Sequence, residues 1–203
     1  MALDHKIRII GGFLKGRKLD VLDVDGLRPT TDRTRETLFN WLGESVVGAS
    51  VLDLFAGSGA LGIESYSRGA KEVHLVEKDA ANAASLQAMI NTLPASPLLT
   101  PKAPHAPVTV HHADALNYVQ SLPQGLGEKG QGFDVIFLDP PFQSQLLEKA
   151  VQLIIERGLL NEEGLVYVEM DKSHKKLLFG LEMIRDTTIG MSHIGLYHKS
   201  FFF

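Results

Sequence analysis

The stretch that decides the fold reads Val51-Leu52-Asp53-Leu54-Phe55-Ala56-Gly57-Ser58-Gly59-Ala60-Leu61-Gly62. An apolar run, a turn with glycines spaced as G-x-G-x-x-G and the start of a helical stretch follow one another here. This order is typical of the first βα unit of a Rossmann-like sheet. A second apolar run, residues 133–139, leads into Asp139-Pro140-Pro141-Phe142. Because open α/β sheets bind ligands at the carboxyl ends of their strands, the two segments predict one site at that edge.

Strand-like and helical stretches alternate from residue 50 onward, which predicts βαβ units and a mostly parallel sheet. Near the end, residues 183–189 and 193–199 flank Gly190 with no helix between them, so we expect an antiparallel hairpin that closes the sheet. The expected strands of the parallel part are 51–56, 72–77, 108–112, 133–139 and 165–169, and the expected helices are 60–68, 80–93, 115–122 and 145–157.

Residues 1–45 are expected to form an N-terminal extension, ahead of a catalytic domain that spans residues 46–203. Residues 6–10 and 17–22 flank a glycine-containing turn and predict a small β-hairpin. After Pro29, Thr31 or Asp32 can cap a helix that runs to about residue 42. We expect the apolar side of this helix to pack on the core and its arginines to face outward.

Charge is distributed unevenly along the chain. The first 40 residues hold eight Lys and Arg against six Asp and Glu, although the whole chain has a net charge of -4. This excess predicts an arm that contacts nucleic-acid phosphates, with a solvated surface of mixed charge as the alternative. The candidate RNA contacts are Arg8, Lys15, Arg17, Arg28, Arg33 and Arg35.

Composition limits the class of protein. The 203 residues are 44% hydrophobic and 22% charged, which fits one substantial core. There are no cysteines, so disulfides, thiolate metal sites and a thiol nucleophile are excluded. The eight histidines lack ligand spacing, and we expect no metal. No apolar run is long enough to span a membrane and no secretory signal is evident, so we expect a cytoplasmic protein.

Asp53 helps to decide which cofactor the glycine turn binds. On its own, the turn with Glu77 twenty residues after Gly57 would also fit a nicotinamide dinucleotide. An acid just before the turn would repel a pyrophosphate but can hold the cationic S-adenosylmethionine. We therefore predict S-adenosylmethionine, with Glu77 accepting from the ribose hydroxyls and Asp114 from the adenine amino group. Asp114 could equally be a helix cap. The predicted cofactor contacts are Asp53, Ala56, Gly57, Ser58, Gly59, Glu77 and Asp114.

The Asp-Pro-Pro-Phe segment predicts methyl transfer to an exocyclic amino group. The lone pair of such an amine is delocalised into the ring, so the catalyst must hold the nitrogen with hydrogen-bond acceptors. We expect the Asp139 carboxylate and the Pro140 carbonyl to accept the two amino protons, and Phe142 to stack on the base. A rigid turn without chemistry is the alternative. The motif leaves open whether the amine belongs to guanine, adenine, cytosine or a glutamine amide.

A wider set of segments resembles the RsmD-type methyltransferases over nearly the whole chain. The resemblance implies a class I methyltransferase fold, S-adenosylmethionine as donor, and guanine N2 of 16S ribosomal RNA in a small-subunit particle as acceptor. Adenine N6 methylation, a nicotinamide-dependent oxidoreductase and an RNA-binding factor without turnover are the alternatives. The segments that carry the resemblance are Arg8-Ile9-Ile10-Gly11-Gly12, Gly16-Arg17-Lys18-Leu19, Leu27-Arg28-Pro29-Thr30-Thr31-Asp32-Arg33, residues 35–42, the glycine turn and Asp139-Pro140-Pro141-Phe142.

Overall fold

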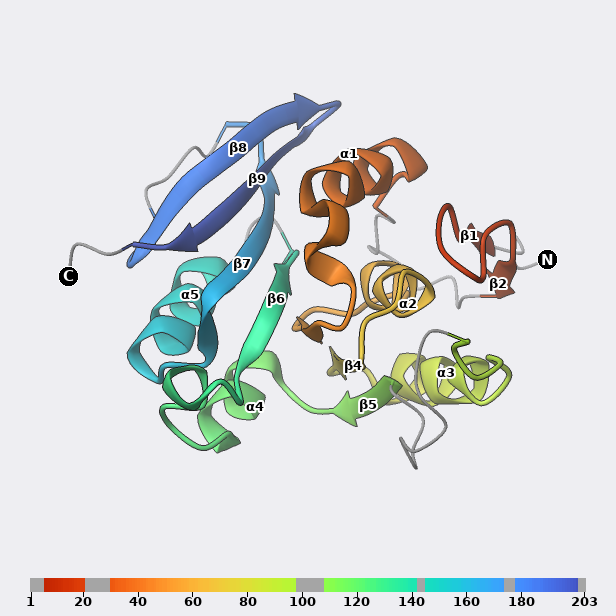
Figure 1. Cartoon of the computed structure of the whole chain (residues 1–203), viewed down its shortest axis with the longest axis horizontal. Helices are drawn as coiled ribbons and strands as arrows, with labels where there is room; N and C mark the ends of the chain where they lie inside the picture. The colour runs from red at the N-terminus through yellow and green to blue at the C-terminus, as the bar shows by residue number, and fades with distance from the viewer. Residues whose placement is uncertain (1–5, 21–29, 98–107, 142–144, 174–177, 201–203) are drawn as a thin grey trace.

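A seven-stranded sheet with helices on both faces forms the centre of the molecule (Figure 1). The computed structural model describes residues 6–20, 30–97, 108–141, 145–173 and 178–200. The strand order is β5-β4-β3-β6-β7-β9-β8, and the first five strands in this order are parallel to one another. The strands are β3 (Ser50–Asp53), β4 (Glu72–Glu77), β5 (Val108–His112), β6 (Phe133–Leu138), β7 (Leu160–Asp171), β8 (Leu181–Ile189) and β9 (Ser192–Lys199).

The order of the strands places a topological switch point between β3 and β6. From β3 the chain moves outward to β4 and β5, then returns to the other side of β3 with β6 and β7. Ligands of open α/β sheets bind at the carboxyl ends of the strands at such a point. The antiparallel pairs β7–β9 and β8–β9 then extend the sheet, as the sequence predicted.

Two hydrophobic layers cover the sheet because side chains alternate between its faces. On one face, Val51, Phe137 and Tyr167 pack against apolar residues of the first three helices. On the other face, Leu52, Ile136 and their neighbours pack against α4 and α5. The helices are α1 (Asp32–Leu42), α2 (Ala60–Ser67), α3 (Ala80–Ile90), α4 (Ala115–Ser121) and α5 (Leu146–Glu156), with short 3₁₀ turns at Gly43–Val46 and Gly127–Lys129.

The N-terminal segment packs into the same core as the sheet. Strands β1 (Lys6–Arg8) and β2 (Lys18–Asp20) pair antiparallel beside α2 and α3 (Figure 1). The buried side chains of Ile9, Leu14 and Leu19 belong to the hydrophobic cluster that also contains Val51. Residues on the two sides of the expected boundary at 45 and 46 therefore share one core.

Most elements match the expected ranges to within a few residues, and the differences in β7 and β3 have a clear structural reason. Strand β7 begins at Leu160 rather than 165, because Phe133 pairs with Leu160 before the register shifts. Strand β3 ends at Asp53, and the glycine turn begins earlier than the apolar run of residues 51–56 suggests. Hydrophobicity in this run continues past the last paired residue because Leu54 and Ala56 are buried beneath the turn.

Candidate active site

The turn after β3 holds the buried carboxylate of Asp53 at the start of α2. Asp53 is only 3% exposed, and its Oδ2 accepts a hydrogen bond of 3.1 Å from the Gly62 backbone N–H. Burial raises the pKa of Asp53 to about 7, and the charge of Glu77 adds to this rise while the Gly62 N–H opposes it. Gly62 also allows α2 to lie close to the sheet, since a Cβ there would meet a Leu75 methyl at 2.2 Å.

Glu77 ends β4 beside the glycine turn and is fixed by two donors. Its Oε1 accepts from the Asp79 N–H at 2.8 Å, and its Oε2 accepts from the Asn82 side chain at 2.9 Å. The same Asn82 amide also donates to the Gly57 carbonyl at 2.7 Å. Asn82 thus ties the turn to the end of β4, a role that no sequence motif predicts. Each Glu77 oxygen retains lone pairs that a ligand hydroxyl can use.

Asp139 follows β6 directly, at the switch point. Strand β6 pairs with β3 in parallel, with Asp53 opposite Phe137, so the ends of the two strands lie side by side. Burial raises the pKa of Asp139 well above its usual range, and the charges of Glu169 and Asp53 raise it further. Both motifs that the sequence singled out therefore meet at one edge of the sheet.

Glu169 lies at the same edge of the sheet, close enough for its charge to affect Asp139. It is 7% exposed and lies near the end of β7, next to β6, where Leu138 pairs with Val168. The hydroxyl of the fully buried Tyr167 donates to Glu169 Oε2 at 3.0 Å. Burial raises the pKa of Tyr167 strongly, and the neighbouring Glu169 and Asp139 charges contribute, so this phenol remains a donor.

The alternation of side chains explains why these acids converge. Asp53 shares a sheet face with Val51, Glu77 with Leu75 and Glu169 with Tyr167, and all three apolar partners belong to the layer beneath α1, α2 and α3. Asp139 receives a hydrogen bond from Thr30, which directly precedes the N-cap of α1 on that face: Thr30 Oγ1 donates to Asp139 Oδ2 at 3.2 Å. Four carboxylates from four neighbouring strands thus point to one side of the sheet edge.

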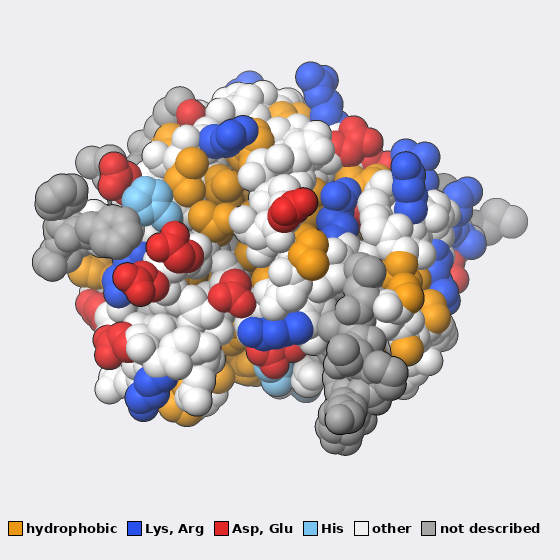
Figure 2. Space-filling model, in the orientation of Figure 1, with side chains coloured by type: hydrophobic (Ala, Val, Ile, Leu, Met, Phe, Trp, Pro, Cys, Tyr) orange, Lys and Arg blue, Asp and Glu red, His pale blue; other side chains and the backbone are white. Residues whose placement is uncertain are grey.

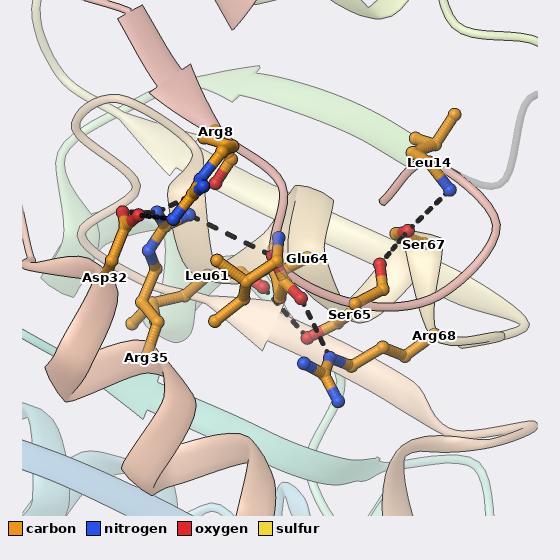
Figure 3. A network of polar contacts seen from close by, with 12 residues as sticks. Arg8, Leu14, Asp32, Arg35, Leu61, Glu64, Ser65, Ser67 and Arg68 are labelled. Atoms are coloured by element: carbon orange, nitrogen blue, oxygen red, sulfur yellow. Dashed lines mark hydrogen bonds and ion pairs between the residues drawn. The ribbon is translucent and has the colours of Figure 1, made fainter. Parts of the chain in front are cut away.

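The N-terminal segment is docked on α2 through buried polar contacts (Figure 3). Glu64 is fully buried, and its Oε2 accepts from the Ile10 N–H at 2.9 Å while Oε1 accepts from Arg68 Nε at 2.9 Å. Ser67 Oγ accepts from the Leu14 N–H at 2.9 Å. Gly12 must be glycine here, because its φ is +73° and a Cβ would lie 1.8 Å from the Ser67 carbonyl oxygen.

The structure contradicts the prediction made for Arg35. It was expected to face outward and contact RNA, but only 1% of it is exposed. Its Nη2 donates to the Arg8 carbonyl at 2.9 Å and to Asp32, and its Nη1 lies 4.0 Å from Glu64 Oε2 (Figure 3). Helical spacing places position 35 toward the core together with Leu38 and Phe39, and the carboxylates of Asp32 and Glu64 compensate its charge. Arg35 therefore anchors α1 and is not available to phosphate in this structure.

The other candidate RNA contacts differ in their surroundings. Lys15 and Arg33 are exposed, and Arg8 is exposed with an ion pair of 3.0 Å to Asp32. Arg17 is half-buried, and its Nη2 donates to the Thr92 carbonyl at 2.9 Å. Lys and Arg side chains gather over the β1–β2 region at the right of Figure 2, whereas Asp and Glu are frequent on the opposite side. Arg28, like the predicted stacking residue Phe142, lies outside the described residues.

Asp114 has a structural role in this arrangement. It is exposed and caps α4, with its Oδ1 accepting from the N–H groups of Leu116 and Asn117 at 3.0 and 3.1 Å. The helix-cap alternative is therefore realised, and a contact between Asp114 and adenine stays a prediction. The remaining predicted cofactor residues, from Asp53 through Gly59 and Glu77, lie around the ends of β3 and β4.

The residues present fit a cationic ligand such as S-adenosylmethionine. Segment 54–62 contains no basic residue, so nothing in it would balance a pyrophosphate. Burial raises the pKa values of Asp53 and Asp139, and repulsion from neighbouring carboxylates raises them further, so the ligand-free edge stabilises their ionised forms poorly. Sulfonium and ammonium groups would relieve this repulsion, and the Glu77 carboxylate can accept from two vicinal hydroxyls.

Comparison with known proteins agrees with this architecture. The family model described as Conserved hypothetical protein 95 matches residues 7–198. The chain is 46% identical over 166 residues to ribosomal RNA small subunit methyltransferase D of Escherichia coli, covering 82% of this chain and 75% of the relative. The chain belongs to the RsmD-type methyltransferase family. The resemblance seen in the sequence is thereby confirmed.

Solved structures place the family in the class I methyltransferase fold. The Escherichia coli protein yhhF superposes with a TM-score of 0.79 at 38% identity and covers 96% of this chain and 98% of its own. A T. thermophilus 16S rRNA N2 methyltransferase, solved with AdoMet and guanosine, has a TM-score of 0.63 at 21% identity, covering 97% of this chain and 50% of its own. The latter likeness concerns the fold, and the fold prediction is confirmed.

Within the described ranges, no group of three or more His, Asp and Glu side chains is placed to hold a metal ion. None of the helices described there combines the length and apolar character that crossing a membrane requires.

Proposed function

We propose that this protein transfers a methyl group from S-adenosylmethionine to the exocyclic N2 of a guanine in 16S ribosomal RNA. One observation carries the proposal: Asp139 of the Asp-Pro-Pro segment lies at the switch point beside Asp53 and the glycine turn, so acceptor and donor sites adjoin. Family membership supports ribosomal RNA of the small subunit as substrate, because the E. coli relative carries that name.

We assign different residues to the donor end and to the acceptor end of the site. Glu77, held by Asn82 and the Asp79 N–H, would accept from the ribose hydroxyls of the donor. Asp53 would balance its positive charge. When bound, S-adenosylmethionine supplies a methyl group activated by the sulfonium. A cation beside Asp53 and Asp139 would favour their ionised forms, and we expect Asp139 to be ionised when the donor is in place.

At the acceptor end, the Asp139 carboxylate and the Pro140 carbonyl would accept the two amino protons and direct the nitrogen lone pair at the methyl carbon. The bond from nitrogen to the methyl carbon forms as the bond from carbon to sulfur breaks. The amino group then loses one proton, and we propose Asp139 as the base that accepts it. After methyl transfer the positive charge of the donor would be gone, and burial would again make Asp139 a better proton acceptor than a solvated carboxylate. Phe142 is proposed to stack on the guanine ring.

We further propose an assembled small-subunit particle in the cytoplasm as the setting of the reaction. The exposed Arg8, Lys15 and Arg33 would contact RNA phosphates next to the site, since Arg33 lies three residues from Thr30 and its Asp139 contact. Adenine N6 remains the alternative acceptor, because it presents the same kind of amino group.

Nucleoside mass spectrometry tests the proposal directly. Ribosomal RNA and small-subunit particles that lack the modification are incubated with the protein and S-adenosylmethionine, and the digested nucleosides are analysed. The proposal expects N2-methylguanosine and no N6-methyladenosine. Methyladenosine as the product would establish the alternative acceptor, and unmodified RNA in both substrates would refute the proposed function.

A further inference from the structure

We propose that Thr30 is a positioning residue for Asp139, and that its hydroxyl turns the carboxylate so that one oxygen stays available to the amino group of the base. The inference deepens the proposed function and rests on it. The observation is the hydrogen bond of 3.2 Å from Thr30 Oγ1 to Asp139 Oδ2, which joins residues 109 positions apart. No sequence motif connects these two positions, and only the fold brings them together.

The chemistry of a hydroxyl suits this role. A threonine hydroxyl has a single proton, so it can hold one carboxylate oxygen and leaves Asp139 Oδ1 for an amino N–H. Its donation also favours the ionised carboxylate, and it lowers the pKa of Asp139 against the larger effects of burial and the Glu169 charge. Thr30 therefore both orients the acceptor and helps to keep it charged.

The position of Thr30 is determined by the start of α1. The next residue, Thr31, is the N-cap of the helix, and its Oγ1 accepts from the Thr34 N–H at 3.2 Å. Asp32 then binds both Arg8 and the buried Arg35. Because Arg35 in turn holds the Arg8 carbonyl, the backbone around Thr30 is tied to the docked N-terminal segment. The hydroxyl thus reaches Asp139 from a fixed helix terminus.

This arrangement links the basic surface to the catalytic acid. Arg33 is exposed on the first turn of α1, and Thr30 directly precedes the N-cap of the same helix. Displacement of this turn by bound RNA would move the donor of Asp139 as well. The N-terminal element would then take part in the reaction itself, in addition to holding the substrate.

The experiment compares Thr30→Val, which keeps the shape and removes the donor, with Thr30→Ser, which keeps the donor. Thr37→Val is the matched control, since Thr37 Oγ1 donates to the Arg33 carbonyl in the same helix and lies away from Asp139. Full-length variants are assayed for kcat, for KM of both substrates and for rate between pH 5.5 and 9. Affinity for S-adenosylhomocysteine and thermal melting are measured in parallel.

For Thr30→Val we expect a 10- to 100-fold lower kcat, with both KM values and the S-adenosylhomocysteine affinity within about threefold of wild type. The acid limb of the pH–rate profile should move to higher pH, because Asp139 loses a donor that favours its ionised form. Thr30→Ser should recover kcat to within about threefold, and Thr37→Val should behave as wild type. An unchanged kcat and pH profile in Thr30→Val, or a Thr30→Ser variant as slow as Thr30→Val, would overturn the inference.

A readout without turnover separates this inference from the proposed function. Carbon-13 NMR of labelled aspartate carboxylates, assigned with Asp139→Asn, follows the titration of Asp139 in wild type and in Thr30→Val. We expect a higher pKa of Asp139 in the variant. A shift seen in a protein that leaves ribosomal RNA unmodified would refute the proposed function and retain the contact. An active enzyme whose Asp139 titration is the same with and without the hydroxyl would refute the role of Thr30 alone.

Discussion

Two regions of the molecule bury charge, and they do so in opposite ways. At the docking site of the N-terminal segment, Glu64 lies among Arg35, Arg68 and the Ile10 N–H, so opposite charges and donors compensate one another (Figure 3). At the sheet edge, burial raises the pKa of Asp139, and the like charges of Glu169 and Asp53 raise it further. Compensated charge stabilises a fold, whereas uncompensated like charge is typical of a site that awaits a cationic ligand.

The largest expected effect comes from breaking the compensated region. Glu64→Ala leaves the buried Arg35 guanidinium with less compensation and removes the acceptor of the Ile10 N–H. We expect the free energy of unfolding, measured by urea denaturation, to fall by about 3–5 kcal/mol. Glu163→Ala, at an exposed position of β7, is the control and should change it by less than about 0.5 kcal/mol. A loss no larger than the control's would show that the docking network does not hold the N-terminal segment.

Whether each region can be predicted from the sequence depends on how far apart its contacting residues lie along the chain. The sheet edge was predictable, because Asp53, Glu77 and Asp139 each end an apolar run and parallel strands bring such ends together. The docking region was not, since its contacts join residues 54 positions apart, as in Ile10 and Glu64. The pattern of α1 predicted that its apolar side packs on the core but could not show that Arg35 would find acceptors there.

Removing the carboxylate of Asp53 at the sheet edge should stabilise the folded protein, whereas removing that of Glu64 should destabilise it. The raised pKa of Asp53 means that the folded protein binds a proton more tightly than the unfolded chain, so stability is lost as pH rises toward and through about 7. Asp53→Asn abolishes this loss and can still accept from the Gly62 N–H. We expect the ligand-free variant to be more stable than wild type by about 2–4 kcal/mol at pH 8, with the difference gone near pH 4.

The same carboxylate should make donor binding depend on pH. Protonation of Asp53 below about pH 7 removes a negative charge from the site, so S-adenosylmethionine affinity should fall by up to about tenfold per pH unit. Calorimetric titrations from pH 5.5 to 8 measure this slope, and Asp53→Asn should be weaker throughout and nearly flat. Equal slopes in the two proteins would exclude Asp53 as the counter-charge.

The smallest expected effect is on RNA binding, and it should differ between Arg33 and Arg35. Arg33 is exposed and Arg35 is buried, so only Arg33 can contact phosphate in this structure. Arg33→Ala should weaken RNA binding a few-fold and reduce the slope of log affinity against log salt by about one, with an unchanged melting temperature. Arg35→Ala should instead lower the melting temperature, because it opens the docking network. A salt slope that is unchanged in Arg33→Ala would remove this residue from the RNA contacts.

The most direct test of the central claim is tritium transfer from labelled S-adenosylmethionine to ribosomal RNA by Asp139→Ala, alongside calorimetry with S-adenosylhomocysteine. If Asp139 holds the amino group at the switch point, transfer should fall by about a thousandfold or more while the affinity for S-adenosylhomocysteine stays within about threefold. Transfer at a rate near that of wild type would contradict the account, because the Asp139 carboxylate would then not be part of the reaction.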